Sequence, residues 1–257
     1  MKKPTILVTN DDGIQAPGIR MLISIMRELG RVIVVAPDKP QSGTSHAITI
    51  YSPLRLIRRH EEKDYVEYTT NGTPVDCVKL GEKVAMEEKP DLLVSGINHG
   101  SNATVNVVYS GTMAAVIEGC MSRISSIGFS LDDYSGDADF EPSKKYVRNI
   151  AENILNNPLP EGTCLNVNIP AVPYNDIKGI RTCRQGLGYW DERFDQRIDP
   201  RKREYFWLTG EYVSLDNGYE DTDEWALENN YVAVVPIKLD WTNYEALENL
   251  KRLDQDA

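Results

Sequence analysis

The chain has 257 residues, which is enough for one large α/β domain or two smaller ones. It carries 28 lysines and arginines against 39 aspartates and glutamates, and the formal net charge of −11 argues against nucleic acid polymers and anionic membranes as main partners. The four cysteines lie far apart without a C-x-x-C pair, as expected for free thiols in a reducing compartment. The sequence shows neither a signal peptide nor a stretch approaching the ~20 apolar residues of a membrane span. We therefore expect a cytoplasmic protein that makes no membrane contact.

The first part of the chain predicts a βαβ unit. Apolar, β-branched residues at 6–8 indicate a buried strand, residues 17–29 carry apolar side chains at helical spacing, and 31–37 is a second continuous apolar strand. The unit lacks the G-x-G-x-x-G fingerprint after its first strand, which disfavours NAD or FAD.

The rest of the chain continues to alternate strands with helices. Residues 48–59 and 64–72 predict antiparallel excursion strands, and a helix should begin at Thr73 and Pro74. The apolar face of that helix would include Val75, Val78, Leu80 and Val84. Further strands are expected at 91–95, 124–131, 165–170 and 231–237, and further helices at 112–121, 143–155, 222–229 and 244–253. Charged and aromatic residues at 180–213 predict a projecting arm that serves as an oligomer contact. The alternation predicts an α/β fold with a mainly parallel sheet and helices on both faces.

Three polar loops follow three of the apolar strands, at 10–13, 38–46 and 96–111. The carboxyl ends of parallel strands face one crevice, so these loops should bring Asp11, Asp12, Ser42 and Asn98 close together. Adjacent carboxylates repel each other, and a cation between them would remove that cost. All four side chains donate oxygen, which suits a hard divalent ion such as Mg²⁺ or Mn²⁺.

Ser110, Gly111 and Thr112 open an apolar helix, and the free N–H groups and hydroxyls of such a helix start can hold a phosphate. Asn106 is a further candidate for a phosphate contact. We add Asn10, Gly43, Thr44 and Asn102, which lie in the same loops, to the residues expected to contact substrate. A simple helix cap at Ser110 and a surface turn at Asp11 and Asp12 remain the plain structural alternatives.

Taken together, the motifs resemble the SurE family of metal-dependent nucleotide phosphatases. The matching motifs are Asn10-Asp11-Asp12-Gly13, Ser42-Gly43, Ser95-Gly96-Ile97-Asn98-x-Gly100-x-Asn102, Tyr109-Ser110-Gly111-Thr112, Gly72-Thr73-Pro74-x-Asp76-Cys77-Val78 and Thr222-Asp223. They occur in the right order between residue 5 and about residue 237. Each motif is weak by itself, whereas the combination is highly specific.

The resemblance implies a 5′- and 3′-nucleotidase that acts on nucleoside monophosphates with one divalent metal ion per subunit, held by Asp11, Asp12, Ser42 and Asn98. It also implies a Rossmann-like core that forms a homodimer or homotetramer. We expect one domain over residues 1–257, in which 180–213 and 238–257 are oligomerisation extensions that use a projecting hairpin and an exchanged C-terminal helix. The arm at 180–213 departs most from the family pattern.

The expected mechanism is metal-assisted, in-line attack of water on the phosphate, with Asp11 and Asp12 as the catalytic residues. Which aspartate acts as general base stays open, and His46 or His99 could donate a proton to the leaving oxygen. A phosphoaspartate intermediate is the rival mechanism, although phosphatases of that kind typically carry D-x-D. Two other functions stay open: a non-catalytic nucleotide- or metal-binding module in the same crevice, and a structural oligomer.

Overall fold

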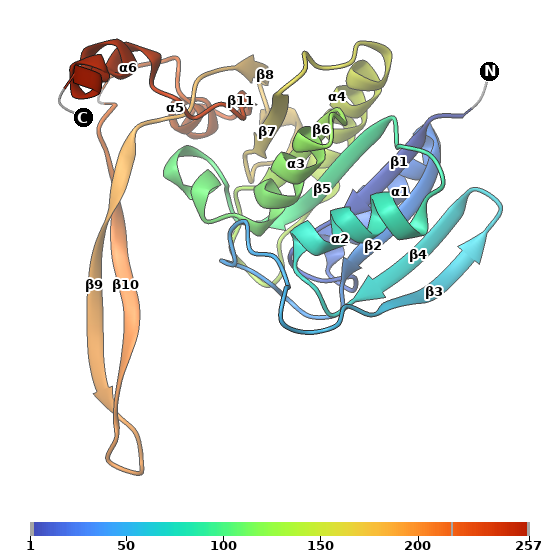
Figure 1. Cartoon of the computed structure of the whole chain (residues 1–257), viewed down its shortest axis with the longest axis horizontal. Helices are drawn as coiled ribbons and strands as arrows, with labels where there is room; N and C mark the ends of the chain where they lie inside the picture. Colours follow the sequence, from blue (N-terminus) through green and yellow to red (C-terminus); the bar gives the residue numbers. More distant parts are fainter. Residues whose placement is uncertain (1–2, 217, 256–257) are drawn as a thin grey trace.

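The computed structural model describes residues 3–216 and 218–255. A nine-stranded sheet has the order β3-β4-β2-β1-β5-β6-β7-β11-β8, and a separate hairpin of β9 and β10 projects from it (Figure 1). Neighbouring strands from β4 to β7 run parallel, whereas β3 pairs antiparallel with β4 and β11 pairs antiparallel with β7. This mainly parallel sheet with a projecting hairpin confirms the predicted fold class.

The elements alternate as the sequence predicted. The strands are β1 (Thr5–Thr9), β2 (Arg31–Pro37), β3 (Leu56–Glu62), β4 (Tyr65–Thr70), β5 (Leu92–His99), β6 (Ser126–Leu131), β7 (Thr163–Ile169), β8 (Gly179–Thr182), β9 (Gly188–Ile198), β10 (Glu204–Ser214) and β11 (Tyr231–Lys238). The α-helices are α1 (Pro17–Leu29), α2 (Pro74–Leu80), α3 (Gly111–Met121), α4 (Lys144–Asn156), α5 (Asp223–Glu228) and α6 (Tyr244–Leu250). Within the described part of the chain, no helix is long and apolar enough to cross a bilayer.

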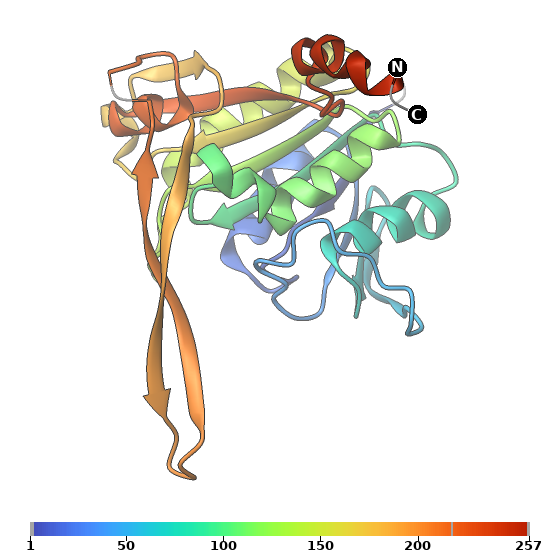
Figure 2. The ribbon, with the colours of Figure 1, turned by 60° about the vertical axis from the view of Figure 1, so that its left-hand side comes forward.

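Helices cover both faces of the sheet (Figure 2), and each face has its own buried core. Ile6 and Val8 of β1 pack with α1 and α4, whereas Leu7 between them packs with α2 and α3. Side chains alternate across a strand, so a strand that is buried on both faces must be apolar throughout. The continuous apolar runs of β1 and β2 therefore mark the centre of the sheet.

Three expectations for the segment after β2 were wrong. β4 pairs parallel with β2, with Val32 opposite Tyr65, so it extends the main sheet instead of forming an excursion. Its antiparallel pairing with β3 is confirmed, but β3 begins only at Leu56. Val84, expected on the apolar face of α2, is 64% exposed because α2 ends at Leu80 and a single π-helical turn follows.

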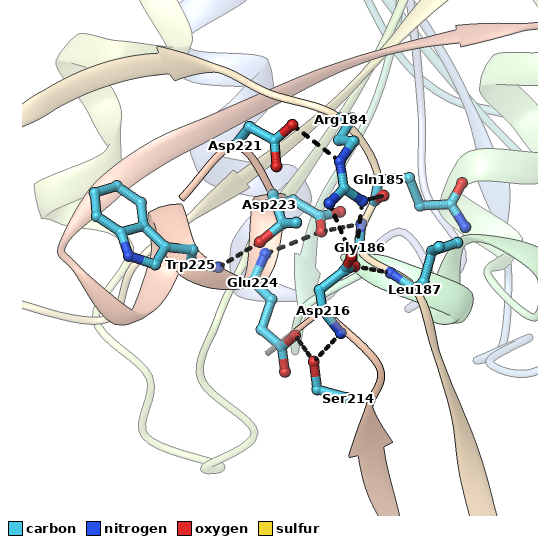
Figure 3. A network of polar contacts seen from close by, with 11 residues as sticks. Arg184, Gln185, Gly186, Leu187, Ser214, Asp216, Asp221, Asp223, Glu224 and Trp225 are labelled. Carbon is cyan, nitrogen blue, oxygen red and sulfur yellow. Dashed lines mark hydrogen bonds and ion pairs between the residues drawn. The ribbon is translucent and has the colours of Figure 1, made fainter. Parts of the chain in front are cut away.

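The projecting arm is confirmed as a hairpin, in which Gly188–Ile198 pairs residue by residue with Glu204–Ser214. Its predicted start at residue 180 was wrong, because residues 180–182 belong to β8, which pairs with β11 in the main sheet. Its base is fixed by a polar network (Figure 3). Arg184 forms ion pairs with Asp216 at 2.8 Å and Asp221 at 3.0 Å, and the backbone N–H of Leu187 donates to Asp216. The direction in which the arm leaves the domain is thus set by charged side chains at its base.

Candidate active site at the carboxyl ends of β1 and β5

β1 and β5 lie side by side, with Thr9 opposite Ser95, and both strands lead directly into polar loops. The loop after β1 is a tight turn in which Asn10 Nδ2 donates to the carbonyl oxygen of Gly13 at 3.0 Å. Gly13 has φ = 92°, a conformation that favours glycine. The turn places Asp11 and Asp12 at the carboxyl edge of the sheet.

Asp11 is buried against the first turn of α3. The hydroxyl of Thr112 donates a hydrogen bond to its carboxylate. A Cβ atom at Gly111 would lie 2.8 Å from the Cβ of Asp11, so only glycine permits this approach. Burial, and then the neighbouring charge of Asp12, raises the pKa of Asp11 to about 6.

Asp12 contacts the loop after β5. The backbone N–H of His99 donates to its Oδ2 atom at 3.3 Å, and burial raises its pKa. The side-chain amide of the adjacent Asn98 donates to the carbonyl oxygens of His99 and Gly100, at 3.2 and 2.8 Å. Both amide hydrogens of Asn98 are thereby engaged inside its own loop, and its Oδ1 atom is the one that can face a ligand.

The third loop approaches the same point through its backbone. The N–H of Gln41 donates to the carbonyl oxygen of Asp11 at 2.7 Å, and the exposed Ser42 follows directly. Gly43 has φ = 72°, and Thr44 Oγ1 donates back to the carbonyl oxygen of Gln41 at 2.7 Å. The structure therefore brings together the loops that carry Asp11, Asp12, Ser42 and Asn98, while their roles as ligands stay predictions.

At the start of α3, Ser110 Oγ accepts the N–H of Met113 at 3.0 Å, so Ser110 is an N-cap. The first N–H groups of a helix have no partner within it, so those of Gly111 and Thr112 can donate to an anion. The Thr112 hydroxyl is already bonded to Asp11. The phosphate contact of Thr112 stays a prediction, and it would use the backbone N–H of Thr112.

The residues at this edge fit a divalent cation. Asn10 Oδ1, Ser95 Oγ and His99 Nε2 are buried without a hydrogen-bond partner among the described residues. No described lysine or arginine lowers the pKa of Asp11 or Asp12. The described part of the chain also contains no group of three or more His, Cys, Asp or Glu side chains that could hold a metal ion. A cation here would therefore be held by two carboxylates and by neutral oxygens, as a hard ion prefers.

The model of the family described as "Survival protein SurE" matches residues 6–192 of this sequence. The chain belongs to the SurE family. A protein named "5'-nucleotidase SurE" from Flavobacterium psychrophilum is 54% identical over 255 residues, which cover 99% of both chains. A protein of the same name from Christiangramia forsetii is 55% identical over 251 residues, covering 97% of this chain and 96% of that relative. The crystal structure of the SurE protein from Aquifex aeolicus matches with a TM-score of 0.84 and 42% identity, covering 98% of this chain and 100% of that one.

Two asparagines predicted to contact substrate have other partners in this SurE-family fold. Asn102 is buried, and its Nδ2 atom donates to Ser130 Oγ at 2.8 Å. Asn106 Oδ1 accepts the indole N–H of Trp190, in the hairpin, at 2.9 Å. Their predicted contacts with phosphate stay predictions, but both side chains already help to hold the loop between β5 and α3.

Sequence reasoning missed the residues that support this loop from outside. Asn168 Oδ1 accepts the N–H of Asn102 at 2.8 Å, and Asn166 Nδ2 donates to the carbonyl oxygen of Asn102 at 2.9 Å. Asn166 and Asn168 alternate with apolar residues in β7 and lie on one face of it. Two amides inside a buried strand were the signal that could have revealed them.

The two loop histidines differ in their surroundings. His46 Nε2 lies 3.2 Å from Glu118 Oε2 in α3, and Glu118 also forms an ion pair with Lys79. His99 stacks on Phe140 with ring centroids 5.3 Å apart, and its Nε2 atom is one of the buried atoms without a described partner. His46 therefore bridges its loop to α3, and proton donation by either ring stays a prediction.

Proposed function

We propose that this SurE-family chain is a divalent-metal-dependent 5′-nucleotidase that hydrolyses nucleoside monophosphates. The observation that carries the proposal is the pair Asp11 and Asp12, of which Asp11 lies against the N-terminus of α3. Both carboxyl groups have raised pKa values, and no described lysine or arginine lowers them. Such a pair would repel a phosphate dianion unless a cation intervened. The names of the two bacterial relatives support the activity itself.

Asp11, Asp12, Ser42 and Asn98 would hold the ion, which supplies Lewis-acid polarisation of the phosphoryl oxygens when bound. The N–H groups of Gly111 and Thr112 would bind the phosphate and orient it for in-line attack. Thr112 also fixes the carboxylate of Asp11 by its hydrogen bond. The chain thus contributes mainly orientation and charge balance, as in other phosphoryl-transfer enzymes.

The test uses purified protein stripped with EDTA and then supplied with Mg²⁺ or Mn²⁺. We expect release of phosphate from 5′-AMP, and also from 3′-AMP, after metal is added and none before. Asp11→Asn should abolish turnover, whereas Asp64→Asn, an exposed aspartate paired with Lys3, should retain it. Tight nucleotide binding without turnover under every metal would instead establish a binding module. Full activity of Asp11→Asn would refute the metal mechanism.

We also propose that the hairpin and the C-terminal segment 238–257 mediate a homodimer or homotetramer. Large apolar side chains in the hairpin are exposed, among them Phe194, Phe206 and Trp207 at 68%, 55% and 59%. Exposed apolar surface of this extent is typical of a subunit contact. Replacing residues 193–209 by a short glycine-serine turn should lower the mass measured by light scattering.

The four cysteines are free and buried, which supports a reducing, cytoplasmic compartment.

A further inference from the structure

A cavity lies between the hairpin and the segment that leads into α3. This cavity has a volume of about 430 Å³ and is lined by Tyr109, Trp190, Glu192, Leu208, Thr209 and Gly210. Tyr109 directly precedes Ser110, the N-cap of α3, and its carbonyl oxygen accepts the N–H of Ser45 at 3.3 Å. Tyr109 therefore connects the cavity to the start of α3, which is the candidate phosphate site, and to the loop that contains Ser42.

The two aromatic side chains of this cavity are accessible and held in place. Tyr109 is 52% exposed and Trp190 is 38% exposed. The indole N–H of Trp190 donates to Asn106 Oδ1 at 2.9 Å, and the N–H of Tyr109 donates to the carbonyl oxygen of Asn106 at 3.1 Å. Tyr212 also packs edge-on against Trp190, with centroids 6.0 Å apart. Asn106 thus ties both aromatic residues to one point of the loop.

The base of the hairpin fixes where Trp190 can lie. Arg184 pairs with Asp216, and Asp223 accepts the N–H of Gly186 at 2.8 Å, only a few residues before Trp190 (Figure 3). The carboxylate of Asp223 also accepts the N–H of Thr104, in the loop that carries Asn106. One buried side chain therefore joins the root of the hairpin to the loop beside the candidate active site.

We infer that Tyr109 and Trp190 bind the nucleobase of the substrate, an inference that rests on the proposed nucleotidase activity. Aromatic rings stack on every base, whatever its hydrogen-bonding pattern, so such a platform binds nucleotides with little sequence preference. Tyr109 precedes Gly111 by two residues, so a nucleoside whose phosphate binds at Gly111 would extend past the cap of α3 to reach the cavity. The hairpin would then complete the substrate site in addition to any part it has in assembly.

A larger cavity of about 680 Å³ also borders Ser110, along α3 and β11. Apart from His46 and Trp241, its apolar lining is aliphatic, with Val108, Ile117 and Val235 among the contributors. It offers no pair of aromatic rings close to the helix start. The cavity between Tyr109 and Trp190 therefore suits a flat aromatic base better.

The test compares AMP with ribose 5-phosphate, which carries the same phosphate ester but no base. Tyr109→Ala should raise the KM for AMP, so that the ratio of kcat/KM for AMP over ribose 5-phosphate falls roughly tenfold, the size of one lost stacking contact. Tyr109→Phe should keep the ratio because it keeps the ring. Tyr174→Ala changes an exposed tyrosine outside both the hairpin and the cavity, so it should leave kcat/KM for both substrates unchanged.

Trp190 requires its own pair of variants, because its loss also frees Asn106. Trp190→Ala should lower the ratio, and Trp190→Phe, which lacks the N–H but keeps a ring, should restore most of it. An unchanged ratio in Tyr109→Ala and Trp190→Ala would overturn the inference, as would a fall caused by Ile117→Ala in the larger cavity. If the unmodified protein hydrolyses neither substrate with any metal, the proposed function itself fails, which is a separate result.

Discussion

Asp223 Oδ2 accepts the backbone N–H of Thr104 at 2.8 Å, across 119 residues of sequence. Its Oδ1 atom accepts the N–H groups of Gly186 and Glu224 at 2.8 and 2.9 Å. Thr104 has φ = 57°, a strained conformation for a β-branched residue. A single buried carboxylate thus holds a strained loop, the root of the hairpin and the start of α5 together.

The first prediction concerns Asp223→Ala. Three backbone N–H groups would lose their acceptor, and we expect the free energy of unfolding to fall by at least about 2 kcal/mol. The loop of Asn98 and Asn106 would loosen, so kcat should fall as well. Urea unfolding and steady-state kinetics measure both. Asp221→Ala removes an exposed partner of Arg184 and should change the free energy of unfolding and kcat little. Equal effects of the two variants would contradict the role assigned to Asp223.

The second prediction concerns the charge of Asp11 in the absence of metal. Its folded-state pKa of about 6 lies above its ordinary value of 3.8, so the stability it contributes at low pH is lost as the pH rises from about 4 through 6. In EDTA at pH 7, Asp11→Asn should therefore be more stable than the unmodified protein, by about 1–3 kcal/mol.

The gain from Asp11→Asn should disappear near pH 4, where the unmodified carboxyl group is protonated in the folded state. Thermal unfolding at several pH values in EDTA checks this. Asp64→Asn serves as the control, because Lys3 lowers the pKa of Asp64 and its loss should bring no gain. If Asp11→Asn is less stable than the unmodified protein at pH 7, burial of the charged Asp11 carboxylate does not destabilise the folded state.

The third prediction concerns the close approach of α3 to Asp11. Alanine favours helices more than glycine does, but a Cβ at position 111 would lie 2.9 Å from Asp11 Oδ2 and displace it. We expect Gly111→Ala to lower kcat about 100-fold, as a misplacement near 1 Å can do. Gly136→Ala is the matched control, since no described atom lies within 4 Å of its added Cβ. Normal turnover in Gly111→Ala would mean that Asp11 need not touch the helix.

The fourth prediction concerns the asparagines of β7. Asn168→Ala removes the acceptor of the Asn102 N–H, and we expect a loss of about 1–3 kcal/mol in stability together with weaker activity. Asn156→Ala, at the exposed end of α4, should be neutral. Phosphate release and urea unfolding provide the comparison. If Asn168→Ala loses stability but keeps full turnover, β7 supports the fold without positioning the loop.

Local sequence was sufficient for much of the fold and for the local backbone structure at the candidate site. The bounds of α1 were predicted correctly because its apolar spacing, Pro17 and Gly30 all act within a few residues. The turn of Asp11 and Asp12 and the cap at Ser110 are local in the same way. The pairing of β4 with β2 was missed because strand alternation does not specify a partner.

The sequence by itself determined the α/β class, the family resemblance and the loops that meet at the carboxyl ends of β1 and β5, because strand direction and short-range patterns are enough for these. Only the tertiary structure decided that Thr112 binds Asp11, that Asp223 holds Thr104 and that Trp190 reaches Asn106. Each of these bonds joins groups from segments that are distant in sequence, and packing of the fold brings those segments together. The sequence shows which residues are polar, but their hydrogen-bond partners depend on which segments the fold brings into contact.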